Sequence, residues 1–463
     1  MHPTTPHDSS PSTRSPGPSY HELLDRDTRP ECVPLALRWR QWEPLGDHDL
    51  PAERYTDRAF HELEKERVWD RVWQMACREE HLPEVGDTYV YDICDRSYLL
   101  VRSAPDRISA FPNACLHRGR LLRERDGRVA DLRCPFHGFC WHLDGSLKQV
   151  PSEWDFTHVR ADEWSLPALR VGTWGGFVFV NPDPAAAPLE DFLGLLPEQF
   201  SSWPLERRYT AVHVARVVRA NWKVTQEAFM EAFHVASTHP QLLPAIGDTN
   251  SQYDWSGNLS RAITPNGTPS PSLRGATDEQ LVFDTMTGRR PGEPSLVALP
   301  DGTTARAAVA AGARARLARV IGADEAERLS DAELADSFYY TLFPNLHPWG
   351  AYNRITYRFR PFEDRHDTSV MECMFLDPYD PSQPRPAPAP VHWLEADQPW
   401  TDAPELGMLA QVFEQDMSNL RQVQRGLASL RKGVTLATYQ ETKVRHFHSV
   451  LDQWIARDPD HRR

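Results

Sequence analysis

The chain has 463 residues, which is enough for two or three domains. It carries 65 acidic and 51 basic residues, and this net charge of −14 argues against a nucleic-acid binder with a basic face. The seven cysteines are an odd number in a long chain, so we expect a reducing compartment and no disulfide framework. No apolar run is long enough to span a membrane, and the Pro- and Ser-rich start lacks a signal-peptide core, so the sequence predicts a cytoplasmic protein.

Hydrophobic periodicity and turn residues divide the chain into five predicted segments. A disordered N-terminal tail comes first, followed by a helix that packs on the larger domain. An all-β domain of short strands comes next, then a domain of helices and antiparallel strands, and last a short C-terminal tail. The predicted bounds of these segments are 1–50, 51–72, 73–184, 185–455 and 456–463.

Within the mixed domain, the clearest predictions are three strands and two long helices. Runs rich in β-branched and apolar residues predict strands at Arg208–Val218, Ile355–Phe359 and Ser369–Leu376. Apolar residues at helical spacing predict one helix from about Asn221 to Pro240 and another from about Glu405 to Leu427.

Two short motifs in the all-β segment each combine one cysteine with one histidine. They are Cys115-x-His117 and Cys134-x-x-His137. Two thiolates and two imidazoles suit a transition metal, and a structural zinc site usually groups its ligands by type. The mixed pairs instead favour a [2Fe–2S] cluster in which one iron takes both thiolates and the other takes both imidazoles, with zinc as the alternative.

A second candidate metal site lies in the segment Asn221–Pro240. His234 and His239 are five residues apart, and Glu227, Glu231 and His234 would share one face of a continuous helix. The surrounding residues are apolar, and polar groups buried among them need a partner. A metal ion is one such partner, and a helix with satisfied histidines and solvated glutamates is the other.

A third acid stands on the apolar stripe of the last long helix. Asp416 lies three residues after Phe413, on the buried face, whereas Glu414 points away from it. A carboxylate in that position is expected either to bind a metal or to pair with a neighbouring arginine such as Arg421 or Arg425.

These three motifs, in this order, resemble those of the alpha (catalytic) subunits of Rieske non-haem iron ring-hydroxylating oxygenases. The resemblance implies an all-β Rieske domain and a helix-grip (START-like) catalytic domain with an antiparallel sheet. It also implies a [2Fe–2S] cluster and a mononuclear Fe(II). The implied cluster ligands are Cys115, His117, Cys134 and His137, and the implied iron ligands are His234, His239 and Asp416.

The resemblance implies a further role for Glu231, which would bridge electron transfer between subunits. Many dihydroxylating members have Asp there, and Glu231 favours a homotrimer, with an additional beta subunit left open. Glu227 departs from the Asn common at its position, and a salt bridge to Lys223 is the plain alternative for it.

The function implied by the resemblance is that of a terminal oxygenase. Electrons would come from a separate reductase or ferredoxin, so that NAD(P)H is used only indirectly, and O2 would be the co-substrate. Hydroxylation of an aromatic or other apolar organic compound is expected, with ring dihydroxylation favoured. A Rieske monooxygenase or demethylase is the alternative, and a protein that only transfers electrons is the remote one.

Overall fold

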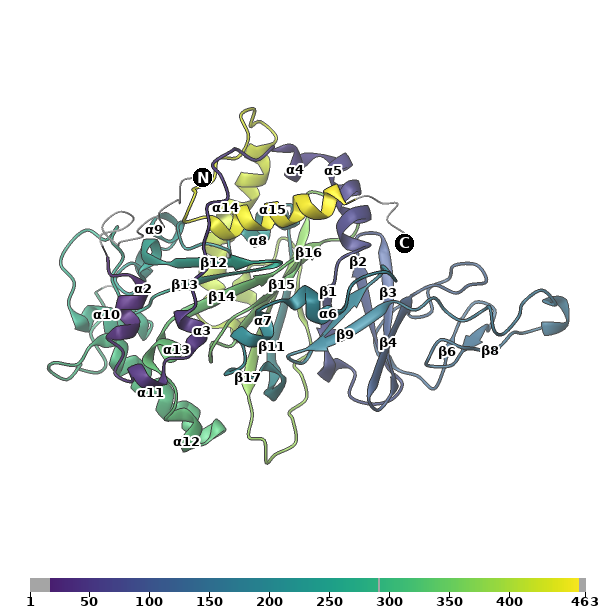
Figure 1. Cartoon of the computed structure of the whole chain (residues 1–463), viewed down its shortest axis with the longest axis horizontal. Coiled ribbons are helices and arrows are strands. Elements are labelled where there is room, and N and C mark those ends of the chain that lie inside the picture. Colours follow the sequence, from purple (N-terminus) through teal and green to yellow (C-terminus); the bar gives the residue numbers. More distant parts are fainter. Residues whose placement is uncertain (1–16, 290–291, 458–463) are drawn as a thin grey trace, which may run out of the picture.

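The computed structural model describes residues 17–289 and 292–457, which form two domains side by side (Figure 1). The first is a β domain of three small sheets, with strand orders β1-β10-β9, β4-β3-β2-β5 and β6-β7-β8. Its strands are β1 Gln74–Arg78, β2 Asp87–Ile93, β3 Arg96–Ala104, β4 Arg107–Pro112, β5 Gly127–Arg128, β6 Leu132–Arg133, β7 Cys140–Trp141, β8 Leu147–Gln149, β9 Arg170–Trp174 and β10 Phe177–Asn181.

The second domain is built on one eight-stranded sheet with the order β12-β13-β14-β15-β16-β17-β11-β18. All neighbouring pairs are antiparallel except β11 and β18. The strands are β11 Arg208–Val218, β12 Gln252–Ser256, β13 Leu259–Thr264, β14 Ser337–Leu342, β15 Leu346–Pro348, β16 Ile355–Pro361, β17 Ser369–Pro378 and β18 His392–Leu394. The three strands predicted from the sequence correspond to β11, β16 and β17.

Three helices that pack on this sheet matter for function. α8 (Trp222–Glu227) contacts β16 and β17, α14 (Leu409–Leu427) contacts α8, and α15 (Thr442–Ala456) contacts β12 and β13. The remaining α-helices in the described ranges are α2 Tyr20–Asp25, α3 Leu35–Arg38, α4 Glu53–Thr56, α5 Arg58–Glu64, α6 Leu189–Leu193, α7 Leu196–Gln199, α9 Val235–Thr238, α10 Glu279–Met286, α11 Ala305–Ile321, α12 Ala323–Ala326 and α13 Asp331–Ala335. None of the helices in the described ranges is long and apolar enough to cross a membrane.

The two domains share one hydrophobic core. Buried side chains of β1 and β10, such as Met75 and Val178, belong to the same cluster as Trp222 and Phe447 of the second domain. The buried Asn345 side chain adds two hydrogen bonds to the backbone of Met75, at 3.0 and 3.2 Å. The junction is therefore packed like the interior of a single domain.

The long helix predicted from Asn221 is wrong in its extent. α8 ends at Glu227, and the next helix, α9, begins only at Val235. Between them Glu231 accepts a hydrogen bond from the backbone N–H of His234 at 3.0 Å, which takes the place of a helical partner. Glu227, Glu231 and His234 therefore do not share one helix face.

The expected N-terminal tail, residues 1–50, is ordered over its described part, 17–50. α2 begins with a capping box between Ser19 and Glu22. Tyr20, Leu24 and Leu37 are buried, and burial of such side chains offsets the entropy of ordering the segment. Residues 1–16, and residues 458–463 of the expected C-terminal tail, lie outside the described residues.

Candidate metal centres

The two Cys/His motifs lie in two loops of the same construction, at one end of the β domain. In each loop the cysteine N–H donates to a carbonyl five residues later, and the cysteine carbonyl accepts from a glycine four residues later. These bonds are Cys115–Arg120 at 2.8 Å, Gly119–Cys115 at 2.8 Å, Cys134–Phe139 at 2.8 Å and Gly138–Cys134 at 3.0 Å. Both glycines have φ near +80°, at +74° and +80°, which suits residues without a side chain.

The side chains of these loops suit a metal group that takes both sulfur and nitrogen ligands. Cys115 and Cys134 are buried, and the rings of His117 and His137 lie 4.7 Å apart between centroids. Burial and the neighbouring Cys134 thiol raise the pKa of Cys115, and a bound metal would favour its thiolate instead. Nδ1 of His117 is buried and has no hydrogen-bond partner among the described residues. An orphaned ring nitrogen beside two thiols fits a [2Fe–2S] cluster.

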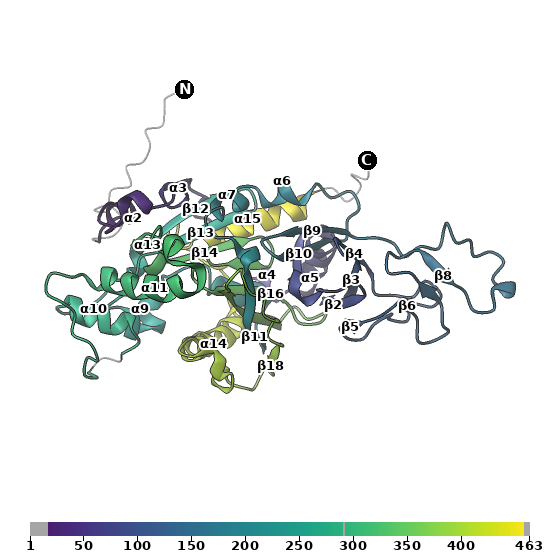
Figure 2. The same ribbon diagram turned by 90° about the horizontal axis from the view of Figure 1, so that it is seen from below.

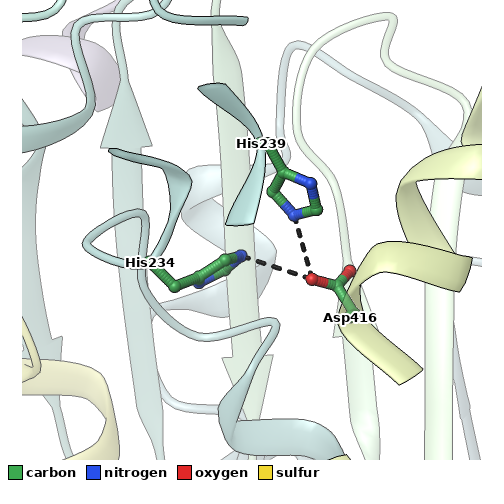
Figure 3. Close-up of side chains that lie close together, drawn as sticks. All are labelled: His234, His239 and Asp416. Atoms are coloured by element: carbon green, nitrogen blue, oxygen red, sulfur yellow. Dashed lines mark hydrogen bonds and ion pairs between the residues drawn. The ribbon is translucent and has the colours of Figure 1, made fainter. Parts of the chain in front are cut away.

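The second centre brings together three side chains from distant parts of the chain (Figure 3). His234 and His239 flank α9 at its two ends, and Asp416 projects from α14. The Nε2 atom of His239 lies 2.9 Å from Oδ1 of Asp416, and that of His234 lies 3.6 Å from the same oxygen. The ligand atoms of the three residues all lie within 4.8 Å of one another, as binding to one ion requires.

The hydrogen bonds of the two histidines fix the nitrogen that each presents to Asp416. Nδ1 of His234 lies 2.6 Å from Oε1 of Glu231, and Nδ1 of His239 lies 2.8 Å from Oε1 of Gln415. Both oxygens only accept, so each Nδ1 carries a proton and Nε2 is the nitrogen that faces Asp416. Both Nε2 atoms and the carboxylate of Asp416 therefore point at one place, where a metal ion could bind all three.

The pKa of His234 also indicates that this site stabilises positive charge. Burial by itself would lower the pKa of His234, but the hydrogen bond and charge of Glu231, together with Asp416, raise it above its ordinary value. The site therefore favours positive charge. Two histidines and one carboxylate in this arrangement are the donor set of non-haem Fe(II) sites with open positions for dioxygen.

The structure does not pair Asp416 with either of the arginines expected as alternative partners, Arg421 and Arg425. Asp416 contacts the two histidines, whereas Arg425 donates to Gln422. Glu414, on the other side of α14, pairs with Arg216 at 3.2 Å.

Glu227 has partners that the sequence did not suggest. Lys223 pairs with Glu64 at 2.6 Å, so the salt bridge to Lys223 that was the plain alternative for Glu227 is not formed. Glu227 instead accepts from the hydroxyl of Tyr55 at 3.1 Å and lies 2.8 Å from Nε2 of His448. Burial raises the pKa of Glu227 to about 8.

A cavity of about 330 Å³ adjoins the second centre. It lies among α8, α14 and the start of α15, and both His234 and Asp416 form part of its wall. Glu231 lines it as well, so this carboxylate contacts the cavity and His234 at once.

Known proteins identify the class of both domains. Residues 72–160 match the Rieske [2Fe-2S] domain, and residues 200–457 match the family described as "Ring hydroxylating alpha subunit (catalytic domain)". The chain therefore belongs to the Rieske non-haem iron oxygenases. Within that class it is a member of the ring hydroxylating alpha subunit family, whose members are the catalytic subunits.

Three curated relatives show the range of the family. The chain is 31% identical over 203 residues to the glycine betaine monooxygenase oxygenase subunit of Pseudomonas aeruginosa, covering 43% of this chain and 47% of the relative. It is 31% identical over 212 residues to the carnitine monooxygenase oxygenase subunit of Escherichia coli strain K12, covering 45% and 57%. It is 30% identical over 228 residues to the biphenyl 2,3-dioxygenase subunit alpha of Rhodococcus jostii, covering 46% and 49%. The alignments span about half the length of these relatives.

Solved structures share the fold over most of the chain. A quaternary ammonium Rieske monooxygenase in complex with L-carnitine matches with a TM-score of 0.61 at 17% identity, covering 88% of this chain and 95% of the other. Naphthalene 1,2-dioxygenase with indole bound matches with a TM-score of 0.60 at 17% identity, covering 90% and 93%. The predicted α+β fold, a Rieske domain joined to a catalytic domain with an antiparallel sheet, is confirmed.

Proposed function

We propose that this chain is the terminal component of a Rieske oxygenase system, with Cys115, His117, Cys134 and His137 as ligands of the cluster. His234, His239 and Asp416 would hold the mononuclear iron. When bound, the cluster supplies single electrons and the iron supplies a place for dioxygen to be reduced. The observation that carries the proposal is the convergence of His234, His239 and Asp416, with both imidazoles oriented by acceptors on Nδ1.

The proposed role of Glu231 is to connect the two centres of neighbouring subunits. Its carboxylate holds Nδ1–H of His234 and also lines the cavity, so it can accept a further hydrogen bond from a histidine outside the chain. His137 is exposed at the end of the β domain and is available for such a contact. We infer a homotrimer, and an assembly with a beta subunit is the competing arrangement, which native mass spectrometry separates.

Electrons would come from a separate reductase or ferredoxin, which NAD(P)H would feed.

The proposed reaction is the monooxygenation of a small organic substrate, with removal of an N-alkyl group as its characteristic outcome. The glycine betaine and carnitine relatives, which are named as monooxygenases, favour monooxygenation. Ring dihydroxylation is the second candidate, which the biphenyl 2,3-dioxygenase relative favours.

The experiment that tests the function starts from anaerobically purified protein. About three irons and about two acid-labile sulfides per chain, with a red-brown visible spectrum, are expected. Zinc without sulfide contradicts the proposal.

Turnover with a reductase under ¹⁸O₂ then separates the two reactions. One labelled oxygen and release of an aldehyde indicate N-dealkylation, and two labelled oxygens on adjacent ring carbons indicate dihydroxylation.

A further inference from the structure

A second cavity, of about 390 Å³, lies where β11 begins and β17 ends. Arg208, the first residue of β11, is in register with Pro378, the last residue of β17, and both form part of the wall. Ile321, at the end of α11, also lines it. The volume is typical of sites for small molecules. The wall has no residue in common with that of the cavity beside the second centre, so the two cavities are separate.

The wall contains a buried guanidinium that lacks a counter-ion. Arg208 is one of three arginines among the largest fully buried side chains, together with Arg78 and Arg261. Arg78 pairs with Glu80 at 3.0 Å. Arg261 pairs with Asp254 at 2.9 Å. Arg208 differs from both, because no described carboxylate lies within ion-pair distance of its guanidinium.

The partners of Arg208 carry no full negative charge. Its guanidinium donates to the backbone carbonyls of Ala351 and Asn353 and lies over the ring of Tyr352, 5.2 Å from the ring centroid. Burial lowers the pKa of Arg208 to about 10, and the charge of Arg78 acts in the same direction, although Tyr352 and two more distant carboxylates oppose it. An anion that enters the cavity would stabilise this desolvated charge.

The other charged groups of the wall leave its balance positive. Arg207 lines the cavity from an exposed position, and no described carboxylate forms an ion pair with it. Glu325 is the one acid among the described residues of the wall, and it accepts a hydrogen bond from the hydroxyl of Tyr352 at 3.1 Å. Two guanidinium groups therefore accompany one carboxylate that already has a partner, and this balance favours an anionic ligand.

The rest of the wall is apolar and rigid. It includes the rings of Tyr352 and Tyr379, and the guanidinium of Arg385 lies over the second ring, 5.8 Å from its centroid. Four aliphatic side chains complete the wall, namely Pro204, Ile321, Pro378 and Pro381. Proline and tyrosine rings have little conformational freedom to lose, so they suit a flat apolar ligand.

We propose that this cavity is a binding site for a small aromatic carboxylate. The two backbone carbonyls use only part of the donors of Arg208, so others remain for the carboxylate of the ligand. Arg207 adds an exposed cation, and the ring of the ligand packs against the tyrosine and proline side chains. The inference goes beyond the proposed function, because none of the proposed metal ligands lines this cavity.

Calorimetric titration of the anaerobic holoprotein with 2-naphthoate tests the inference. 2-Naphthamide is the matched neutral probe, and acetate supplies the charge without the ring. 2-Naphthoate is expected to bind at about one site per chain and at least about 10-fold more tightly than either of the others, the effect of one charged hydrogen bond. Equal affinity for 2-naphthamide, or no binding of 2-naphthoate at millimolar concentration, overturns the inference.

Variants of the two arginines locate the binding site. Arg208→Gln is expected to weaken 2-naphthoate binding by at least about 10-fold. Arg207→Gln should weaken it by about 3-fold, because that charge is exposed and screened by solvent. Arg316→Gln removes an exposed arginine of α11 that does not line the cavity, and it should bind like the parent. Unchanged affinity in both Arg207→Gln and Arg208→Gln contradicts the assignment.

Ile321→Trp tests the site without altering its charge or the buried Arg208. The larger side chain fills the cavity, so the affinities of 2-naphthoate and 2-naphthamide should both fall by at least about 10-fold. Melting temperature and the visible spectrum establish that each variant is folded. Unchanged binding in folded Ile321→Trp places the ligand elsewhere and overturns the inference.

Binding should not depend on the second centre. Protein depleted of the mononuclear iron is expected to bind 2-naphthoate with the affinity of the holoprotein. Loss of binding together with the iron would place the ligand at the metal centre, which would overturn this inference and leave the proposed function intact.

Discussion

Two hydrogen bonds determine how the histidines of the second centre are turned. Glu231 orients His234 and Gln415 orients His239, and only the first of these acceptors is a carboxylate. A charged acceptor makes its imidazole more basic than an amide does. The two imidazoles therefore differ in donor strength although the sequence presents them as equivalent.

The Gln415 side chain is predicted to support metal binding without touching the metal. Gln415→Leu removes the acceptor for Nδ1 of His239, and loss of such a partner typically lowers metal affinity by about 10- to 100-fold. Gln415→Glu keeps an acceptor and should retain affinity. Anaerobic titration of Fe(II) into iron-depleted second sites measures the effect.

The matched control for Gln415 is Gln411→Leu, which makes the same change at an exposed position of α14. Equal Fe(II) affinity in the two leucine variants would show that Gln415 does not position His239.

Asp416→Asn is predicted to remove the mononuclear iron alone. The change exchanges a charged ligand oxygen for a neutral one, so iron should fall from about three to about two per chain while sulfide stays near two. Glu414→Gln, on the other side of α14, should retain all the iron. Metal and sulfide analysis checks both variants, and loss of the cluster together with the iron would argue against separate sites.

At the scale of elements, α8 depends on one buried ion pair. Lys223 on α8 and Glu64 on α5 are both fully buried and lie 2.6 Å apart. Burial raises the pKa of Glu64 and lowers that of Lys223, because each charge has lost its water. The pair fixes the helix from which Glu227 reaches the cavity.

Glu64→Leu is predicted to lower the free energy of unfolding by about 3–5 kcal/mol, because it leaves the ammonium of Lys223 buried and unpaired. Combining it with Lys223→Met should recover most of that loss, since neither charge then remains. Asp162→Asn, which removes an exposed pair with Arg160, should cost less than about 1 kcal/mol. Urea titration measures all of these, and a double variant as unstable as Glu64→Leu would mean that packing, not charge, dominates.

The elements that the sequence predicts correctly are those with a local signal. The strand Arg208–Val218 was predicted with the bounds of β11, and α14 follows its apolar stripe. The break after Glu227 has no such signal, because it depends on a side chain accepting the N–H of His234. The ordered segment 17–50 is similar, since its apolar residues are few and their partners are distant in sequence.

The residues of the candidate sites also divide into those that a local sequence pattern indicates and those that it does not. Cysteine and histidine spacing indicates the first motif without tertiary information, and both histidines of the second centre lie in one short segment. Gln415 gives no signal, because an amide beside a predicted ligand is common on any helix. Tyr55 and His448 reach Glu227 from positions 172 and 221 residues away, and only the fold brings them together.

At the scale of the whole molecule, the two candidate centres lie in different domains, far from each other within one chain. The strands β6 and β8, next to the cluster motifs, and the helix α9, between the two histidines, lie toward opposite ends in both views (Figures 1 and 2). This arrangement favours electron transfer from one subunit to the next over transfer within a chain.

A mixture of two inactive variants is predicted to regain activity. Cys134→Ala should lack the cluster and Asp416→Asn the iron, so each alone has no turnover. In a head-to-tail ring formed from equal amounts, about a quarter of the junctions pair an intact cluster with an intact iron site. Turnover of the co-expressed mixture near about a quarter of the parent value is therefore expected. No recovery, with mixed oligomers verified by mass spectrometry, would place the transfer within one chain.

The continuous core between the domains has a mechanical consequence. Side chains such as Met75 and Val178 pack in one cluster with Trp222 and Phe447, and Asn345 forms two hydrogen bonds with the backbone of β1. An electron-carrying domain on a flexible hinge can move between its electron donor and its electron acceptor. A domain that shares its hydrophobic core with the catalytic domain cannot. The electron donor therefore has to dock at a fixed site on the β domain. The tunnelling distance from the cluster to the iron that accepts the electron is fixed when the subunits assemble. Turnover should therefore be insensitive to solvent viscosity wherever docking is saturated.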